Sequence, residues 1–187
     1  MVHYITSYNN SEEPLPKFLI PFLKFVEENF ETYDTQLKEG QNPDFRIKEA
    51  LIHAIDRIST PLIKQTSLHG PIIELLTENV IPDLRSENKY LRERAILCIG
   101  KFSRLAFSDE VNFKIAETMV SLLKDEELPI QVAAATSVYL YLRKDKIKSI
   151  FAEHLSTLLE SYLHVMELID HEELVSALED IVGQFAE

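Results

Sequence analysis

Cysteine and glycine are scarce in this chain, and each shortage narrows the range of folds and compartments that fit it. A single cysteine, Cys98, excludes an internal disulfide framework and favours a reducing compartment, the cytosol, the nucleus or both. Only four glycines and eight prolines interrupt the sequence, so long stretches are free to be helical. No apolar run approaches the roughly 20 residues of a membrane span, and the N-terminus lacks the basic start and apolar block of a signal peptide.

Basic residues are also few. The chain has 19 Lys and Arg against 31 Asp and Glu, which gives a net charge of −12. This balance argues against direct binding of nucleic acid, because phosphate contacts require clustered Lys and Arg. It suits a basic protein partner, although an excess of acid also simply keeps a solvated surface soluble. Hydrophobic residues make up 45% of the 187 residues, enough to build a buried core.

What is present is a repeated apolar stripe at helical spacing. Between Leu91 and Phe102 the apolar positions describe one face of a helix. The same five-point pattern recurs at intervals of 44, 39 and 44 residues, and only Ser137 departs from it. The four stripes are Ile47, Leu51, Ala54, Ile55 and Ile58; Leu91, Ala95, Cys98, Ile99 and Phe102; Ile130, Ala134, Ser137, Val138 and Tyr141; and Leu174, Leu178, Ile181, Val182 and Phe185. This period predicts an all-α, right-handed superhelical HEAT-repeat (ARM-like) solenoid of about four helical hairpins.

Turn signals divide the chain into a lead-in and a repeat segment. We expect residues 1–21 to be a lead-in or the end of a preceding repeat, and residues 22–187 to form the repeat segment. Its predicted units cover about residues 22–61, 71–107, 109–145 and 147–187. Apolar residues continue close to the last position without a polar capping repeat, so we expect the chain to be a piece of a longer protein.

Several residues predict where helices begin, end or bend. Gly40 suits a left-handed cap at the end of the first helix, and Asp44 suits the N-cap of the second. Pro82 is expected to kink the first helix of the second unit, and Asp170 with Glu173 has the spacing of a capping box. The predicted apolar face of the first helix, which is expected to begin at Phe22, consists of Phe22, Val26, Phe30, Tyr33 and Leu37.

Residues capable of chemistry do not assemble into a catalytic, cofactor or metal motif. His164 and His171 lie seven positions apart across a predicted turn, whereas zinc hydrolases place two histidines four apart on one helix. Cys98 lies on the predicted buried face, with no base on that face to lower its pKa. The sequence has no glycine-rich phosphate loop and no Ser-His-Asp order. We therefore expect no enzyme, no cofactor and no metal site.

The second helix of each hairpin offers better candidates for a binding surface. In helical arrays these helices commonly line the concave side. The residues that point away from the stripe and are predicted to bind a partner are Glu49, His53, Asp56, Glu93, Glu179 and Asp180. A basic partner would be held by several contacts, each worth about 1 kcal/mol or less when exposed. Plain solvated helix faces explain the same residues equally well. Lys48, Arg92 and Gln131 share one position in three units, and we interpret them as structural.

Three runs of sequence carry a family resemblance. They are KEALIHAI from Lys48, NVIPDL from Asn79 followed by LRERA from Leu91, and LLKDEELPIQVAAA from Leu122. In this order, over residues 44–185, they resemble the central HEAT repeats of karyopherin-β nuclear transport receptors, most of all the importin-seven and importin-eight subfamily. The resemblance implies a receptor that carries basic protein cargo, such as ribosomal proteins and histones, through the nuclear pore and so shuttles between nucleus and cytoplasm.

The same resemblance implies a set of partners. Cargo affinity would be controlled by the small GTPase Ran in its GTP-bound form, and Ran would bind regions outside this chain, because the family's main Ran-binding region lies in N-terminal repeats. Whether nucleoporins touch this segment stays open, and neither nucleic acid nor a membrane is an expected partner. The alternative is a HEAT-repeat scaffold or adaptor subunit of a stable complex, bound to one partner largely through apolar surface.

Overall fold

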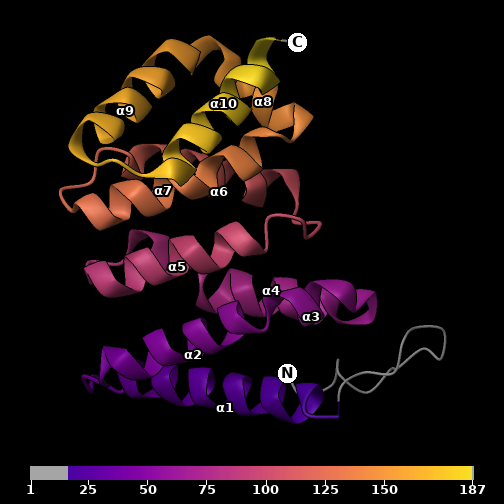
Figure 1. Cartoon of the computed structure of the whole chain (residues 1–187). Coiled ribbons are helices and arrows are strands. Elements are labelled where there is room, and N and C mark those ends of the chain that lie inside the picture. Colours follow the sequence, from indigo (N-terminus) through magenta and orange to yellow (C-terminus); the bar gives the residue numbers. More distant parts are fainter. Residues whose placement is uncertain (1–16, 187) are drawn as a thin grey trace.

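The computed structural model describes residues 17–186, and every regular element in this range is helical (Figure 1). The α-helices are α1 (Leu19–Lys38), α2 (Phe45–Arg57), α3 (Ser59–Lys64), α4 (His69–Asn79), α5 (Lys89–Lys101), α6 (Asp109–Leu122), α7 (Leu128–Leu142), α8 (Asp145–Phe151), α9 (Leu155–Leu168) and α10 (Glu172–Ala186). The 3₁₀ helices are η1 (Thr66–Leu68), η2 (Ile81–Arg85) and η3 (Ala152–His154). The predicted all-α class is confirmed for the described residues, and most of the expected lead-in lies outside them.

Local sequence explains several helix ends. Gly40 has a φ of +75°, the left-handed conformation that glycine adopts without steric cost, and it follows α1. Asp44 caps α2, because its Oδ1 accepts a hydrogen bond from the backbone N of Arg46 at 3.0 Å. Asn88 caps α5 in the same way by accepting from Tyr90 N, also at 3.0 Å. The predicted roles of Gly40 and Asp44 are confirmed.

The helices α2, α5, α7 and α10 pack in succession, each against the next, and Figure 1 shows them one above another. The elements η2, α6 and α8 pack against members of this series. Tyr141, which is fully buried, donates a hydrogen bond from α7 to the carbonyl oxygen of Ile99 on α5 at 2.8 Å. All members of the two central stripes, including Ser137, are buried. One apolar core therefore runs from Leu19 to Ile181.

The predicted stripes are wrong in places toward the two ends of the series. Ile47 on α2 and Val182 on α10 are 49% and 50% exposed, respectively. These two helices are the first and last of the series, so each has a neighbouring second helix on one side only. The face predicted for α1 is also partly wrong, because Leu37 is 48% exposed. The helix begins at Leu19 rather than Phe22, and its buried residues are Leu19, Leu23, Val26, Phe30 and Tyr33.

Three predicted helix details differ in the structure. Pro82 does not kink a continuous helix, because α4 ends at Asn79 and the proline stands at the start of the 3₁₀ helix η2. The first helix expected in the last unit is divided into α8, η3 and α9. The predicted capping box is wrong, since α10 begins at Glu172 and His171 rather than Asp170 immediately precedes it. Leu174 N donates to the carbonyl oxygen of His171 at 3.0 Å.

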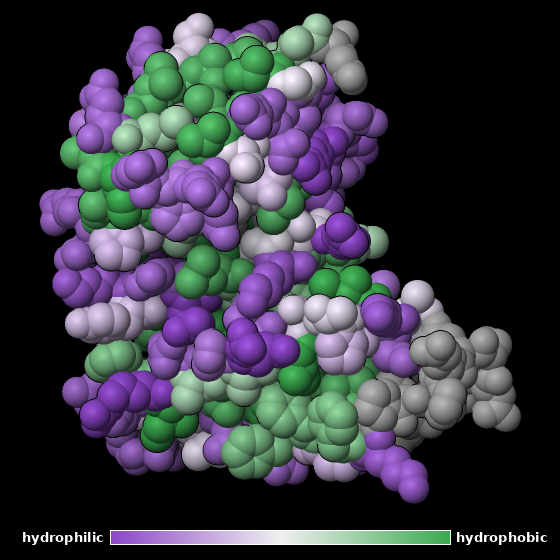
Figure 2. All heavy atoms as spheres, viewed as in Figure 1, coloured by the Kyte–Doolittle hydropathy of each residue, from purple (hydrophilic) through white to green (hydrophobic). Residues whose placement is uncertain are grey.

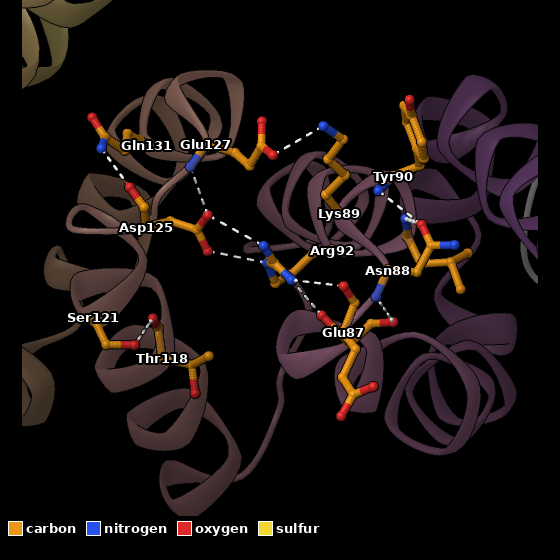
Figure 3. Close-up of polar contacts among 12 residues, drawn as sticks. Glu87, Asn88, Lys89, Tyr90, Arg92, Thr118, Ser121, Asp125, Glu127 and Gln131 are labelled. Carbon is orange, nitrogen blue, oxygen red and sulfur yellow. Dashed lines mark hydrogen bonds and ion pairs between the residues drawn. The ribbon is translucent and has the colours of Figure 1, made fainter.

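A ladder of polar contacts joins successive layers of the stack (Figure 3). Arg92 on α5 forms an ion pair with Asp125, which follows α6, at 3.1 Å, and Gln131 Nε2 donates to the Asp125 carbonyl oxygen at 2.5 Å. One layer earlier, Lys48 Nζ lies 2.8 Å from Asp83 Oδ2 on η2, and both side chains are about nine-tenths buried. The structural interpretation of Lys48, Arg92 and Gln131 is confirmed.

Candidate functional site

The six predicted partner-binding residues are distributed over three of the stacked helices. Glu49, His53 and Asp56 lie on α2, Glu93 lies on α5, and Glu179 and Asp180 lie on α10. The face visible in Figure 2 mixes hydrophilic side chains with separate hydrophobic patches. The contacts of each residue therefore decide what it is free to bind.

The candidates on α2 are engaged by basic residues of α5. Arg94 donates from Nε to Glu49 Oε1 at 2.6 Å and from Nη1 to His53 Nδ1 at 2.9 Å. Lys101 Nζ lies 2.8 Å from Asp56, whose side chain is buried. Because a buried carboxylate without a cation is costly, the Asp56 pair belongs to the packing of α2 on α5. Glu49 and Asp56 are thus neutralised within the chain.

On α10 the two candidates differ. Asp180 Oδ2 accepts from Arg143 Nη2 at 2.8 Å, an ion pair that joins the end of α7 to α10, with both side chains about half exposed. Glu179 is exposed and forms no ion pair with any residue of the described range. Glu93 on α5 likewise forms no ion pair within residues 17–186. These two carboxylates are available to a partner.

Glu93 lies between two cavities that differ in their walls. The cavity toward α2, of about 340 Å³, is lined by Phe45, Arg46, Glu49, Tyr90, Glu93 and Arg94. Its aromatic rings are stacked, with the centroids of Phe45 and Tyr90 5.7 Å apart, and Tyr90 is 55% exposed. The chain itself supplies cations here, because Lys89 Nζ lies 5.8 Å from the centroid of the Tyr90 ring and Arg46 and Arg94 also line this cavity.

The second cavity, of about 350 Å³, opens between α5, α7 and the start of α10. Its walls are Glu93, Leu97, Leu128, Pro129, Val132, Ala133, Thr136, Ile169, His171 and Glu173. The Nδ1 atom of His171 is buried and has no hydrogen-bond partner. Two carboxylates and aliphatic walls match a side chain with an apolar stem and a cationic head, that is, lysine or arginine.

Reasoning from sequence missed the basic partners of the acids and the aromatic pair. A usable signal was present, because Arg94 and Lys101 each follow their acidic partner by 45 positions, one more than the 44-residue period. The period places Glu93 at the level of Glu49, and so it places Arg94 one residue further along the same helix. A shift of one residue on a helix turns the side chain by about 100°, enough to decide between solvent and a neighbour.

Among the described residues, no group of three or more His, Cys, Asp or Glu side chains is placed to hold a metal ion. Cys98 is fully buried, and burial raises the pKa of its thiol, which opposes thiolate formation. Across residues 17–186, no helix combines the length and apolarity needed to cross a membrane.

Comparison with known proteins gives distant relatives. The chain is 27% identical over 177 residues to the importin beta-like SAD2 homolog of Arabidopsis thaliana. The matched region covers 94% of this chain and 17% of that protein. It is 25% identical over 155 residues to importin-8 of Mus musculus, or 81% and 15% of the two chains. A probable importin-7 homolog of Dictyostelium discoideum is 27% identical over 146 residues, or 78% and 14%. No family model and no solved structure matches. The chain spans about a sixth of the length of these curated relatives.

Proposed function

This chain is a distant homologue of importin-7 and importin-8 among the importin-β-like karyopherins. We therefore propose that it is the segment of a nuclear transport receptor that binds basic protein cargo. The proposed fold is a right-handed HEAT-repeat superhelix with units at about residues 22–61, 71–107, 109–145 and 147–187. The packing of α2, α5, α7 and α10 in succession supports this architecture. The homology to importins also supports the expectation that the chain is not an enzyme.

The position of Glu93 is the observation that carries the proposal. Its carboxylate has no ion-pair partner among residues 17–186 and lines the aliphatic cavity between α5, α7 and the start of α10, whose walls contain no lysine or arginine. Such surroundings favour lysine and arginine side chains over a purely apolar ligand, because only a cation satisfies the carboxylate. With a net charge of −12, the chain also attracts a basic protein before contact.

The contacts divide the six candidate residues into two groups. Glu93 and Glu179 are proposed to touch cargo directly. Glu49, Asp56 and Asp180 are proposed to act mainly by holding the stacked helices in register, since each already binds a basic residue of the chain. His53 joins the second group through its hydrogen bond with Arg94.

The transport setting follows from the family and is part of the proposal. The receptor would shuttle between nucleus and cytoplasm, and GTP-bound Ran would control cargo affinity through regions outside this chain. Nucleoporins would be contacted during passage through the pore.

The test replaces free carboxylates on the proposed face with neutral isosteres. The variant Glu93→Gln/Glu173→Gln/Glu179→Gln is compared with Glu110→Gln/Glu153→Gln/Glu160→Gln, which removes the same charge from α6, η3 and α9. Binding of purified core histones is measured by fluorescence anisotropy over a range of salt concentrations. We expect the first variant to bind about tenfold more weakly, since three exposed contacts of roughly 0.5 kcal/mol each are lost, and the control to change less than twofold.

Two results would contradict the proposed face. Equal weakening by both variants would indicate attraction to net charge alone. Unchanged, salt-insensitive binding would favour the alternative of a scaffold that binds its partner through apolar surface.

A further inference from the structure

A third cavity, a groove, lies between α1 and α4, which carry none of the candidate cargo residues. It encloses about 370 Å³. Its floor is apolar and includes the buried side chains of Leu23, Phe30 and Ile72. A partly apolar groove of this size can hold one or two side chains of a docked segment.

The rim of this groove is acidic. Glu27, Glu31 and Asp34 come from α1, and Glu74 and Glu78 come from α4, against a single lysine in the lining, Lys38. None of the five carboxylates forms an ion pair within residues 17–186. Burial raises the pKa of Glu27, and the nearby charges of Glu31 and Glu74 raise it further. The carboxylates thus repel one another, and a cation placed between them would relieve that repulsion.

We propose that this groove is a second docking site, which binds a lysine- or arginine-rich segment of a partner protein that also carries one apolar side chain. The apolar side chain would lie on the floor formed by Leu23, Phe30 and Ile72. The cationic side chains would lie between the carboxylates of α1 and those of α4. The inference goes beyond the proposed function, because it uses other helices and would allow the chain to hold two basic segments at once.

Charge also argues against the other occupants that the chain itself could supply. Residues 1–16 contain Glu12 and Glu13 and no lysine or arginine, so the α-amino group is outnumbered and the net charge of the segment does not complement the rim. A second copy of the chain brings a net charge of −12 to an already acidic groove. A basic segment of another protein is the occupant that satisfies both the floor and the rim.

The test places a reporter in each of the two sites. Thr35 lines the groove and is exposed, so Thr35→Cys accepts a small environment-sensitive dye, whereas the buried Cys98 does not react. Ser176→Cys on the exposed side of α10 reports on the cargo face. The 187-residue chain is titrated with a synthetic peptide of four lysines around one leucine, and with a matched peptide in which glycine replaces the leucine.

Groove binding predicts three results at the Thr35→Cys reporter. The affinity for the leucine peptide falls at least tenfold in Glu31→Gln/Glu74→Gln/Glu78→Gln. In the unsubstituted groove, the glycine peptide binds severalfold more weakly than the leucine peptide. There the affinity for the leucine peptide also falls as salt screens the carboxylates. The Ser176→Cys reporter is unchanged by the groove substitutions. The salt dependence of peptide affinity in the unsubstituted groove is a second, independent measurement, because it does not require the triple variant to fold.

Failure of this inference and failure of the proposed function give different results. No response of the Thr35→Cys dye, or an affinity there that the triple variant leaves unchanged, would overturn the groove while leaving the cargo face untouched. Groove binding that persists when histones do not bind the cargo face would support the groove and contradict the proposed function.

Discussion

At the scale of single residues, the buried ion pair between Lys48 and Asp83 is the most consequential contact. The two side chains are about nine-tenths buried and lie 2.8 Å apart, and Lys48 Nζ also lies 5.8 Å from the ring centroid of Tyr33. Burial raises the pKa of Asp83, and Lys48 opposes that shift. Each charge therefore depends on the other for its compensation.

Lys48→Met tests this dependence. It leaves Asp83 buried without a cation, so we expect a loss of about 3–5 kcal/mol in the free energy of unfolding at pH 7. Without Lys48 the pKa of Asp83 rises further. When a carboxyl has a higher pKa in the folded than in the unfolded protein, the folded protein loses stability as pH rises through that pKa and regains it as pH falls. The deficit should therefore shrink at pH 4, as measured by urea denaturation at both pH values.

The matched control is the double variant Lys48→Met/Asp83→Leu. Removing both charges is expected to recover most of the stability, since a buried ion pair often contributes little more than apolar residues of similar volume. A double variant as unstable as Lys48→Met would show that Lys48 acts through its packing on Tyr33 rather than through its charge.

At the scale of the elements, α5 and α7 approach closely where Gly100 faces Ser137. A Cβ added at Gly100 would lie 2.8 Å from Ser137 Oγ and 3.1 Å from Ser137 Cβ. The one departure from the apolar stripe thus has a steric reason, because a larger residue at position 137 would separate the two helices. Small residues on both sides permit the contact.

Gly100→Ala is expected to destabilise the chain although alanine favours helices. The gain in helix propensity is about 1 kcal/mol, whereas overpacking of a tight contact costs about 1–3 kcal/mol. In a Ser137→Gly background the contact is open, and the same substitution should become stabilising. Gly183→Ala on α10 is the control, since nothing lies within 4 Å of its added Cβ, and it should raise the unfolding midpoint. Stabilisation by Gly100→Ala in the native background would contradict the close approach.

The same helices show how much of the fold could be predicted from sequence. The stripes of α5 and α7 were predicted correctly, because each of these helices has neighbours on both sides and its whole apolar face is buried. Ile47 and Val182 follow the same pattern but are half exposed, since burial depends on a neighbour that a period does not report. The candidate acids were located on their helices, but their pairing with Arg94 and Lys101 depends on helix rotation, which hydrophobic spacing leaves uncertain by about one residue.

At the scale of the whole molecule, one continuous apolar core is built from contacts between neighbouring layers. The principal contacts of α10 are with α7 and α9, whereas α2 packs mainly on α1, α5 and α3. A perturbation in α10 must therefore pass through α7 and α5 before it reaches α2. In such an arrangement stability is approximately a sum of unit and interface contributions rather than a single all-or-none quantity.

Ile181→Ala makes this layering measurable. Ile181 is fully buried on α10, so its truncation is expected to cost about 2–5 kcal/mol where α10 packs against the rest of the stack. In native-state hydrogen exchange, protection of α9 and α10 should fall by about 1.5 to 3.5 orders of magnitude, while α2 should change less than threefold because the layers between them stay folded. An equal loss of protection in α2 and α10 would mean that the layers unfold as one cooperative unit. Graded loss would instead allow α10 to adjust to a partner bound near Glu179 while the contacts between α2 and α5 remain intact.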